Sequence, residues 1–384
     1  MVAHGPDVAG FTKTPDMEKE CSSCHSDIID NFPLSKHAMF NDLTSEDDEF
    51  VVRAALHVRR VSDDQEKQGQ MAEAIDHSCA VCHRTTCGSC HITLPAPAHG
   101  GFPNTGHLFF RPNLLNNCTA CHGGRKYPEF MADIPSEAVD ESDILDWNPE
   151  RDVHYSEYDL DCVDCHGKSW MHENTTDMTK KLRYEDEALP TCEGCHLGDE
   201  ATFFSNAYHS QHSGEDATNA NLQCQVCHAQ PSPDCLSCHV DPDVEGEPPP
   251  DCEFYTTKIA LNPFVYSTWY ADNLPNLGER YPYEYSIVRR ATIVRDTFDK
   301  YGSDILSNFT AYPTWKFGSP HNIQKITPQT KDGCNSCHGH SEFFLTEDYL
   351  EKLMTQDCAT TSPYLADELE ANSEILVAEI PSSR

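Results

Sequence analysis

The chain has 384 residues, 38% of them hydrophobic, and its mean hydropathy of −0.58 is low for a protein of this size. Its 63 acidic and 27 basic residues give a formal net charge of −36, which disfavours binding to nucleic acid and to anionic membranes. No apolar run is long enough to span a bilayer, so we expect no transmembrane segment. The 20 cysteines and 21 histidines are unusually many for this length.

The first 20 residues, Met1–Glu20, are polar and lack periodicity, which is typical of an extended arm. This arm contains His4. The pattern Cys-x-x-Cys-His follows at Cys21–His25. In this pattern two thiols form thioethers to a porphyrin, and the histidine after them coordinates its iron. The pattern therefore indicates attachment of haem c.

Nine copies of the pattern account for 18 of the 20 cysteines. The predicted thioether cysteines are Cys21, Cys24, Cys79, Cys82, Cys87, Cys90, Cys118, Cys121, Cys162, Cys165, Cys192, Cys195, Cys224, Cys227, Cys235, Cys238, Cys334 and Cys337. The predicted proximal iron ligands are His25, His83, His91, His122, His166, His196, His228, His239 and His338. A zinc site needs ligands in fours, and a redox dithiol occurs once in an alternating strand and helix pattern. Neither explains nine copies, so we expect nine covalent haem c groups.

Glu46–Asp76 has apolar residues at helical spacing and is predicted to form a helix that carries His57. Two motifs then follow within Cys79–His91, with only three residues between them, which forces two porphyrins into near contact. Eight motifs fall in the first 240 residues, which leaves 30 residues for each. That is too few to wrap each haem separately, so we expect haems to stack and form the core.

The expected fold is mostly irregular, with short α-helices and little β-structure, and residues 1–240 form an eight-haem electron-transfer domain. Asp241–Asp251 is rich in proline and is predicted to be a linker. Residues 241–384 are then a small aromatic-rich C-terminal subdomain with one haem. Within it, Tyr285–Tyr301 is expected to be partly helical, and the acidic tail from Asp367 is expected to lie on the surface or fray.

The two cysteines outside the motifs, Cys252 and Cys358, flank the C-terminal subdomain. A disulfide between them would clamp its two ends. The alternative is a pair of buried free thiols, which an oxidising compartment disfavours. Haem c is attached outside the cytoplasm, so we expect an exported protein.

Twelve histidines remain after the nine proximal ligands are assigned. A second histidine on every iron would need nine of them. Ten histidines are candidates for these distal positions, one more than needed, because His77 and His99 compete for one iron. The candidates are His37, His57, His77, His99, His107, His154, His172, His209, His212 and His321. His340 lies two residues past His338 and is not expected to reach another iron. An iron with two protein ligands can pass electrons but has no open position for a substrate.

The chain resembles exported multihaem c-type cytochromes of extracellular electron transfer, of the nanowire and cell-surface type. The resemblance covers most of the chain and is carried by Cys79–His91, Gly106-His107, Asp152-Val153-His154, Cys162–His166, Met171-His172-Glu173, Cys224–His239, Pro313-Thr314-Trp315-Lys316, Pro320-His321-Asn322-Ile323 and Cys334–His338.

This resemblance implies a continuous chain of stacked, mostly bis-histidine haems that carries electrons at or beyond the cell surface. Its implied partners are other copies of itself, other cytochromes and an extracellular electron acceptor. Some members of the group form filaments in which a histidine of one subunit ligates a haem of the next. Carried onto this chain, His4 is the candidate for that inter-subunit ligand.

The density of motifs is also similar, more distantly, to that of octahaem tetrathionate reductases and hydroxylamine oxidoreductases. Those enzymes retain one haem with an accessible or lysine-bound iron. This chain has no Cys-x-x-Cys-Lys, and its histidines suffice to fill every iron. We therefore expect an electron-transfer protein and not an enzyme, with a multihaem reductase of tetrathionate, nitrite or hydroxylamine as the alternative.

Overall fold

The computed structural model describes residues 22–31, 64–74, 118, 122, 126–132, 150–167, 184, 189–197, 205–214, 221–232, 257–291, 295–355 and 365–382. The chain divides into two compact units. Unit 1 comprises Met1–Arg59, Asp63–Gly123 and Asp159–Pro190, and unit 2 comprises Arg60–Ser62, Gly124–Tyr158 and Thr191–Arg384. The predicted boundary between residues 240 and 241 lies outside the described residues and stays a prediction.

Unit 1 contains the helices α2 (Ser22–Asn31), α4 (Gln65–Ala74) and α10 (Cys162–Cys165). The helix expected over residues 46–76 is confirmed where the chain is described, in α4. Met71 and Ala74 lie three residues apart on that helix, and both are buried. The 3.6-residue period brings both to one face of α4. The apolar residues on which the helix prediction was based, at 51–58, lie outside the described residues.

Unit 2 is built on an antiparallel sheet in the order β1 (Lys258–Leu261), β2 (Tyr285–Arg290), β3 (Trp315–Phe317). The prediction of partial helix over 285–301 was wrong, because residues 285–290 form the central strand of this sheet. Ile287 lies opposite Ile259 on β1, and Val288 lies opposite Phe317 on β3. Pairing on both edges satisfies the backbone of β2, and its β-branched side chains suit a pleated surface.

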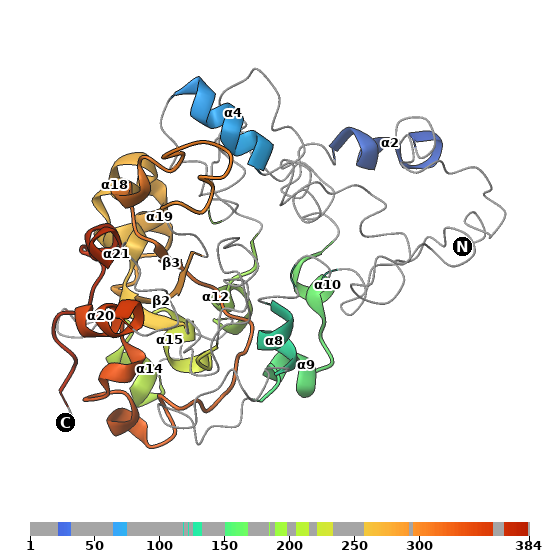
Figure 1. The fold of residues 1–384 in the computed structure, drawn as a ribbon. Coiled ribbons are helices and arrows are strands. Elements are labelled where there is room, and N and C mark those ends of the chain that lie inside the picture. The colour runs from blue at the N-terminus through green and yellow to red at the C-terminus, as the bar shows by residue number, and fades with distance from the viewer. Residues whose placement is uncertain are drawn as a thin grey trace. The chain divides into compact units, whose positions relative to one another are not determined.

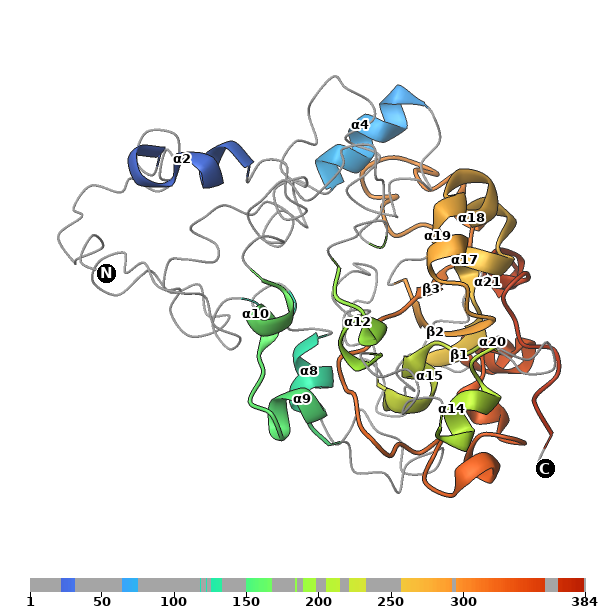
Figure 2. The ribbon, with the colours of Figure 1, turned by 180° about the vertical axis from the view of Figure 1, so that it is seen from behind.

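The two faces of the sheet support separate apolar clusters, because neighbouring residues of a strand point to opposite faces. One cluster consists of Ala260, Val288, Trp315, Leu345, Leu350, Leu353 and Ile375. The other consists of Val226, Ile259, Ile287, Phe343, Phe344 and Val377. The second cluster contains Val226 of α15 (Cys224–His228), so this motif helix packs against the sheet. Figure 1 and Figure 2 show α15 beside β2.

Three short helices, α17 (Pro263–Tyr266), α18 (Thr268–Asn273) and α19 (Pro275–Arg280), follow β1. Their aromatic side chains pack with β3: the rings of Phe264 and Phe317 stack at 4.7 Å, and Tyr270 meets Phe264 edge to face at 5.2 Å. The unit also contains η7 (Phe309–Ala311), η8 (Gly333–Ser336), η9 (Ser341–Phe343), α20 (Glu347–Thr355) and α21 (Leu365–Asn372).

The acidic tail is packed over residues 367–377, so the expectation that it lies on the surface or frays was wrong there. Glu368 of α21 is fully buried and forms an ion pair of 2.8 Å with Arg290 of β2. Its carboxylate also accepts a hydrogen bond of 2.6 Å from the Thr314 hydroxyl. Ile375 and Val377 are buried beyond it. Arg290 on β2 therefore keeps this carboxylate in the core, although the sequence pattern predicted that it would be exposed to solvent.

The remaining helices of unit 2 are α8 (Lys126–Met131), α9 (Val153–Ser156), α12 (Cys192–His196), α14 (Ala207–Gln211) and α15. Helices of four to six residues are not stable alone in water, so tertiary contacts must hold them. Within the described ranges, no helix combines the length and apolar character needed to cross a membrane.

Candidate functional site

The motif helices α10, α12 and α15 begin at their first cysteine. In α12 the hydroxyl of Thr191 accepts a hydrogen bond from the Gly194 N–H at 3.1 Å, which caps the helix just before Cys192. In α10 the side chain of Asp161 caps the helix in the same way. The two cysteines of each motif are three residues apart, so the helix brings them to one face, and the histidine lies one turn after the first cysteine.

The last motif adopts a tighter turn. Cys334 lies in η8, and the N–H of His338 donates to the carbonyl oxygen of Cys334 at 3.0 Å, which closes one turn around the motif. In α2 the backbone of His25 departs from helical geometry (φ −129°, ψ 37°), so the helix bends at that motif's histidine.

Many predicted site residues lie outside the described residues, or their side chains do, and their roles stay predictions. These are Cys21, Cys24, Cys79, Cys82, His83, Cys87, Cys90, His91, Cys121, Cys235, Cys238 and His239 of the motifs, the distal candidates His37, His57, His77, His99, His107 and His172, and His4, Cys252 and Cys358.

Three motif histidines each face a histidine from elsewhere in the chain. The ring centroids of His154 and His196 are 6.0 Å apart, with an interplanar angle of 60°. Those of His209 and His228 are 6.1 Å apart, also at 60°. A third pair, with centroids 6.3 Å apart at 45°, joins the two histidines His212 and His338.

These separations fit two imidazoles on opposite sides of one metal ion. With a metal–nitrogen bond of about 2.0 Å and about 1.1 Å from nitrogen to ring centre, the centroids lie about 6 Å apart. Edge-to-face aromatic contacts fall in the same range. What distinguishes the arrangement is that every pair joins one motif histidine to one histidine predicted as a distal ligand.

Hydrogen bonds orient several of these rings. Nδ1 of His228 donates to the carbonyl oxygen of Gln324 at 3.0 Å, and Nδ1 of His338 donates to that of Ser382 at 3.1 Å. A carbonyl oxygen only accepts, so Nδ1 carries the proton and Nε2 keeps its lone pair for a metal. Burial also lowers the pKa of His228, which favours the neutral form that binds metal.

The helix α14 supplies two of the opposing histidines. His209 lies in its last turn, and His212 is its C-cap. The side chain of Asn206 caps its start by accepting from the Tyr208 N–H at 2.9 Å. At the other end, the carbonyl oxygen of His212 accepts from the Leu222 N–H at 3.0 Å. These contacts fix the start of α14 and the backbone of His212.

The cysteines of neighbouring motifs also meet. The thiols of Cys192 and Cys224 are close enough to shift each other's pKa, as are those of Cys118 and Cys162 in unit 1. Burial raises the pKa of the Cys227 thiol to about 11. A reactive dithiol has a lowered thiol pKa. The shift at Cys227 has the opposite direction and disfavours a redox dithiol at this motif.

Two residues near these motifs were not predicted from the sequence. The hydroxyl of Tyr283 donates to Glu193 Oε1 at 2.6 Å, and the same oxygen accepts from the Cys224 thiol at 3.4 Å. Burial, followed by the hydrogen bond to Glu193, raises the pKa of Tyr283. Glu193 occupies a variable position of its motif, so no pattern in the sequence marks it.

His321 and His340 have different settings. The backbone N–H of His321 donates to the buried Glu129 at 3.0 Å, and its Nδ1 donates to the carbonyl oxygen of Ser319 at 2.9 Å. The His340 side chain is 47% exposed and contacts Glu342 through Nδ1 at 2.7 Å. Its predicted lack of a ligand role stays a prediction.

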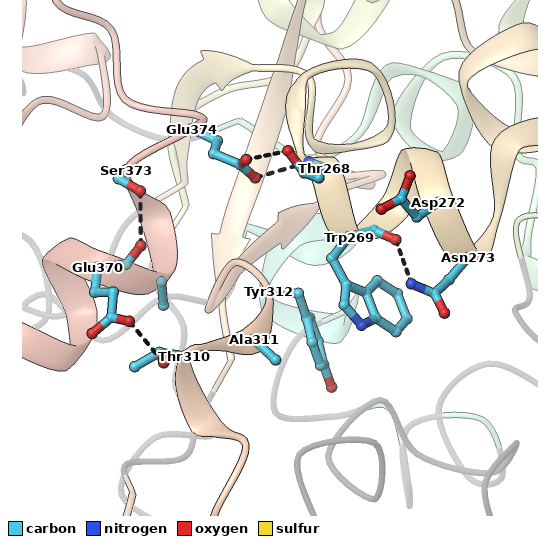
Figure 3. A pocket seen from close by; sticks show the side chains of 11 residues that line it. Thr268, Trp269, Asp272, Asn273, Thr310, Ala311, Tyr312, Glu370, Ser373 and Glu374 are labelled. Carbon is cyan, nitrogen blue, oxygen red and sulfur yellow. Dashed lines mark hydrogen bonds between the residues drawn. The ribbon is translucent and has the colours of Figure 1, made fainter.

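A shallow pocket of about 390 Å³ lies apart from these histidines, between α18, η7 and α21. Figure 3 shows that its two glutamates already have partners. Glu374 accepts from the N–H of Thr268 at 2.8 Å and from its hydroxyl, and Glu370 accepts from the Thr310 hydroxyl at 3.3 Å. Trp269 packs against Tyr312 in its wall, with ring centroids 4.6 Å apart.

Across the described part of the chain, no group of three or more histidine, cysteine, aspartate or glutamate side chains converges as a metal site. The paired histidines are therefore the candidate site.

Compared with known protein families, with curated proteins and with solved structures, the chain gives no significant match.

Proposed function

We propose that the protein is an electron-transfer cytochrome with nine covalent haem c groups, which conducts electrons through stacked, bis-histidine haems. The observation that carries this proposal is the set of three ring pairs at 6.0, 6.1 and 6.3 Å. Sequence spacing identifies one member of each pair as a proximal ligand, and the other member belongs to the predicted distal set.

Each residue then has a defined role. Bound haem supplies one-electron chemistry at its iron. The proximal ligands His196, His228 and His338 would hold three of the irons from the motif side. The carbonyl groups behind His228 and His338 keep those rings in the tautomer that binds metal.

Three of these haems would form a row in the order of their motifs. The Cys224 sulfur lies 3.4 Å from Oε1 of Glu193, the residue after Cys192, so the motifs of His196 and His228 are adjacent. Cys337 packs against the apolar cluster that contains Val226 of α15, so the motifs of His228 and His338 are also close together. The middle haem would therefore neighbour both others, which supports a continuous path in unit 2.

The setting of the protein is part of the same proposal. We infer that the protein is exported and works at or beyond the cell surface. Its net charge of −36 keeps it highly solvated and favours cationic partners over anionic ones. Other cytochromes, an extracellular acceptor and further copies of the chain in a filament are the proposed partners, with His4 as the bridging ligand.

Mass spectrometry and electron paramagnetic resonance (EPR) of the oxidised protein test the redox assignment together. We expect nine haems per chain and only low-spin ferric signals. A high-spin signal that responds to nitrite, hydroxylamine or tetrathionate would support the reductase alternative. Fewer than nine covalent haems would contradict the assignment of the motifs.

Electron microscopy of the native material tests the filament. We expect filaments whose repeat matches one subunit, and His4→Ala is expected to abolish them while nine haems stay attached. Isolated particles in the unmodified protein would contradict this part of the proposal. They would leave the conducting row within one chain intact.

A further inference from the structure

Asp152 is a buried carboxylate directly behind one of the paired histidines. Asp152 is 2% exposed. Its Oδ1 accepts from the backbone N–H of His154 at 2.8 Å and from the ring Nδ1 of His154 at 2.9 Å. The other oxygen, Oδ2, accepts from the backbone N–H of Ile323 at 2.8 Å. Both carboxylate oxygens therefore accept hydrogen bonds, and Oδ1 holds the imidazole at its Nδ1 atom.

This partner differs in charge from those of the neighbouring rings. His228 and His338 donate through Nδ1 to neutral backbone carbonyls, whereas His154 donates to a carboxylate. A carboxylate behind a metal-bound histidine raises the basicity of the ring. The effect is strengthened in buried surroundings, where charges are poorly screened.

We propose that Asp152 is a positioning residue that lowers the reduction potential of the haem shared by His154 and His196. This inference rests on the proposed function and deepens it. A more basic ligand and a nearby negative charge both stabilise the ferric state, which carries one positive charge more than the ferrous state. Asp152 therefore biases one end of the three-haem row towards electron donation.

Asp152 also has a structural role, which the test must separate from the electronic one. Its Oδ2 contact and the hydrogen bond of 2.9 Å from the Val153 N–H to the Ile323 carbonyl oxygen join two segments. Gln230 joins the same segments elsewhere: its amide donates to the Glu150 carbonyl oxygen at 2.8 Å and to the Asn322 carbonyl oxygen at 3.3 Å.

The experiment is a redox titration of the full haem-loaded protein, followed by optical and EPR spectroscopy, with three variants. Asp152→Asn removes the charge and keeps the shape. Glu342→Gln makes the same change behind His340, which has the same type of contact but no predicted ligand role. Gln230→Ala loosens the junction without touching the carboxylate.

We expect Asp152→Asn to shift the ferric-to-ferrous equilibrium of one haem about tenfold towards ferrous, an upward shift of about 59 mV. The EPR g-values of one low-spin haem should change with it. Glu342→Gln and Gln230→Ala should leave every potential unchanged. An unchanged potential in Asp152→Asn, or an equal shift in Gln230→Ala, would overturn the inference.

Two further measurements keep the test decisive. Asp152→Glu keeps the carboxylate and should retain the low potential. If neither Asp152 variant accumulates, pulsed EPR of the unmodified protein can read the remote ring nitrogen of the low-spin haem that is lost in His154→Ala. A nitrogen coupling typical of a carboxylate-bound ring supports the inference, and that of an ordinary imidazole overturns it. Failure of the proposed function is distinguishable, because unmodified protein would then lack haem or low-spin signals.

Discussion

His209 and His212 lie three residues apart at the end of one short helix, yet they face the histidines of two different motifs. The ring of His209 is 6.1 Å from that of His228, and the ring of His212 is 6.3 Å from that of His338. One turn of α14 thus serves two candidate irons. Its capped ends keep the two rings in register with both motifs.

Removing either histidine should change a different haem. We expect His209→Ala and His212→Ala each to convert one low-spin haem to high-spin, and the double variant to convert two, because each ring is proposed to occupy one axial position. Optical and EPR spectra of the oxidised protein measure this. His340→Ala is the control and should leave every haem low-spin. A single variant that altered both haems, or neither, would contradict the pairing.

The buried ion pair between Glu368 and Arg290 should dominate the stability of the C-terminal packing. Glu368→Ala leaves a buried guanidinium without its carboxylate, so we expect the free energy of unfolding to fall by about 3–5 kcal/mol. Denaturant unfolding of the haem-loaded protein measures it. Asp367→Asn, which alters a more exposed contact of 3.4 Å with Arg295, should cost less than about 1 kcal/mol. Equal costs would show that burial does not decide the effect.

The buried Tyr283 should make stability depend on alkaline pH. Its folded pKa is raised, so above the unfolded pKa of about 10 the folded state binds more protons and stability falls as pH rises. Tyr283→Phe should lose about 1 kcal/mol below pH ~10, because the hydrogen bond to Glu193 is gone. Above that pH the unmodified protein should lose this advantage. Thermal unfolding across this pH range measures both, and a constant difference would contradict the prediction.

The two cysteines outside the motifs should be oxidised. We expect no reactive thiol in the denatured, unreduced protein and two after reduction, because the proposal assigns 18 of the 20 cysteines to haem and the other two to a disulfide. Thiol titration with mass spectrometry measures this. Replacement of Cys252 and Cys358 by serine should remove both reactive thiols. Two reactive thiols before reduction would instead support the buried free thiols.

Predictions from local sequence were wrong in two places where a distant partner decides the structure. Residues 285–290 are a strand because β1 and β3 pair with both of their edges. The tail around Glu368 is buried because Arg290 neutralises its charge. Neither partner is visible in the local pattern. The helix at Gln65–Ala74 lies within the range predicted as helical, although the apolar spacing behind that prediction is at residues 51–58, outside the described part of the chain.

The sequence by itself determined the number of motifs, the cysteines and histidines in each, and the set of histidines left over, because each motif is defined by residues within one helical turn. Only the tertiary structure decided which spare histidine faces which motif. His154 reaches His196, and His212 reaches His338, through packing of segments far apart in the chain. The same packing set the buried carboxylate of Asp152 behind His154. Such choices depend on long-range burial and hydrogen bonding, which a local pattern does not encode.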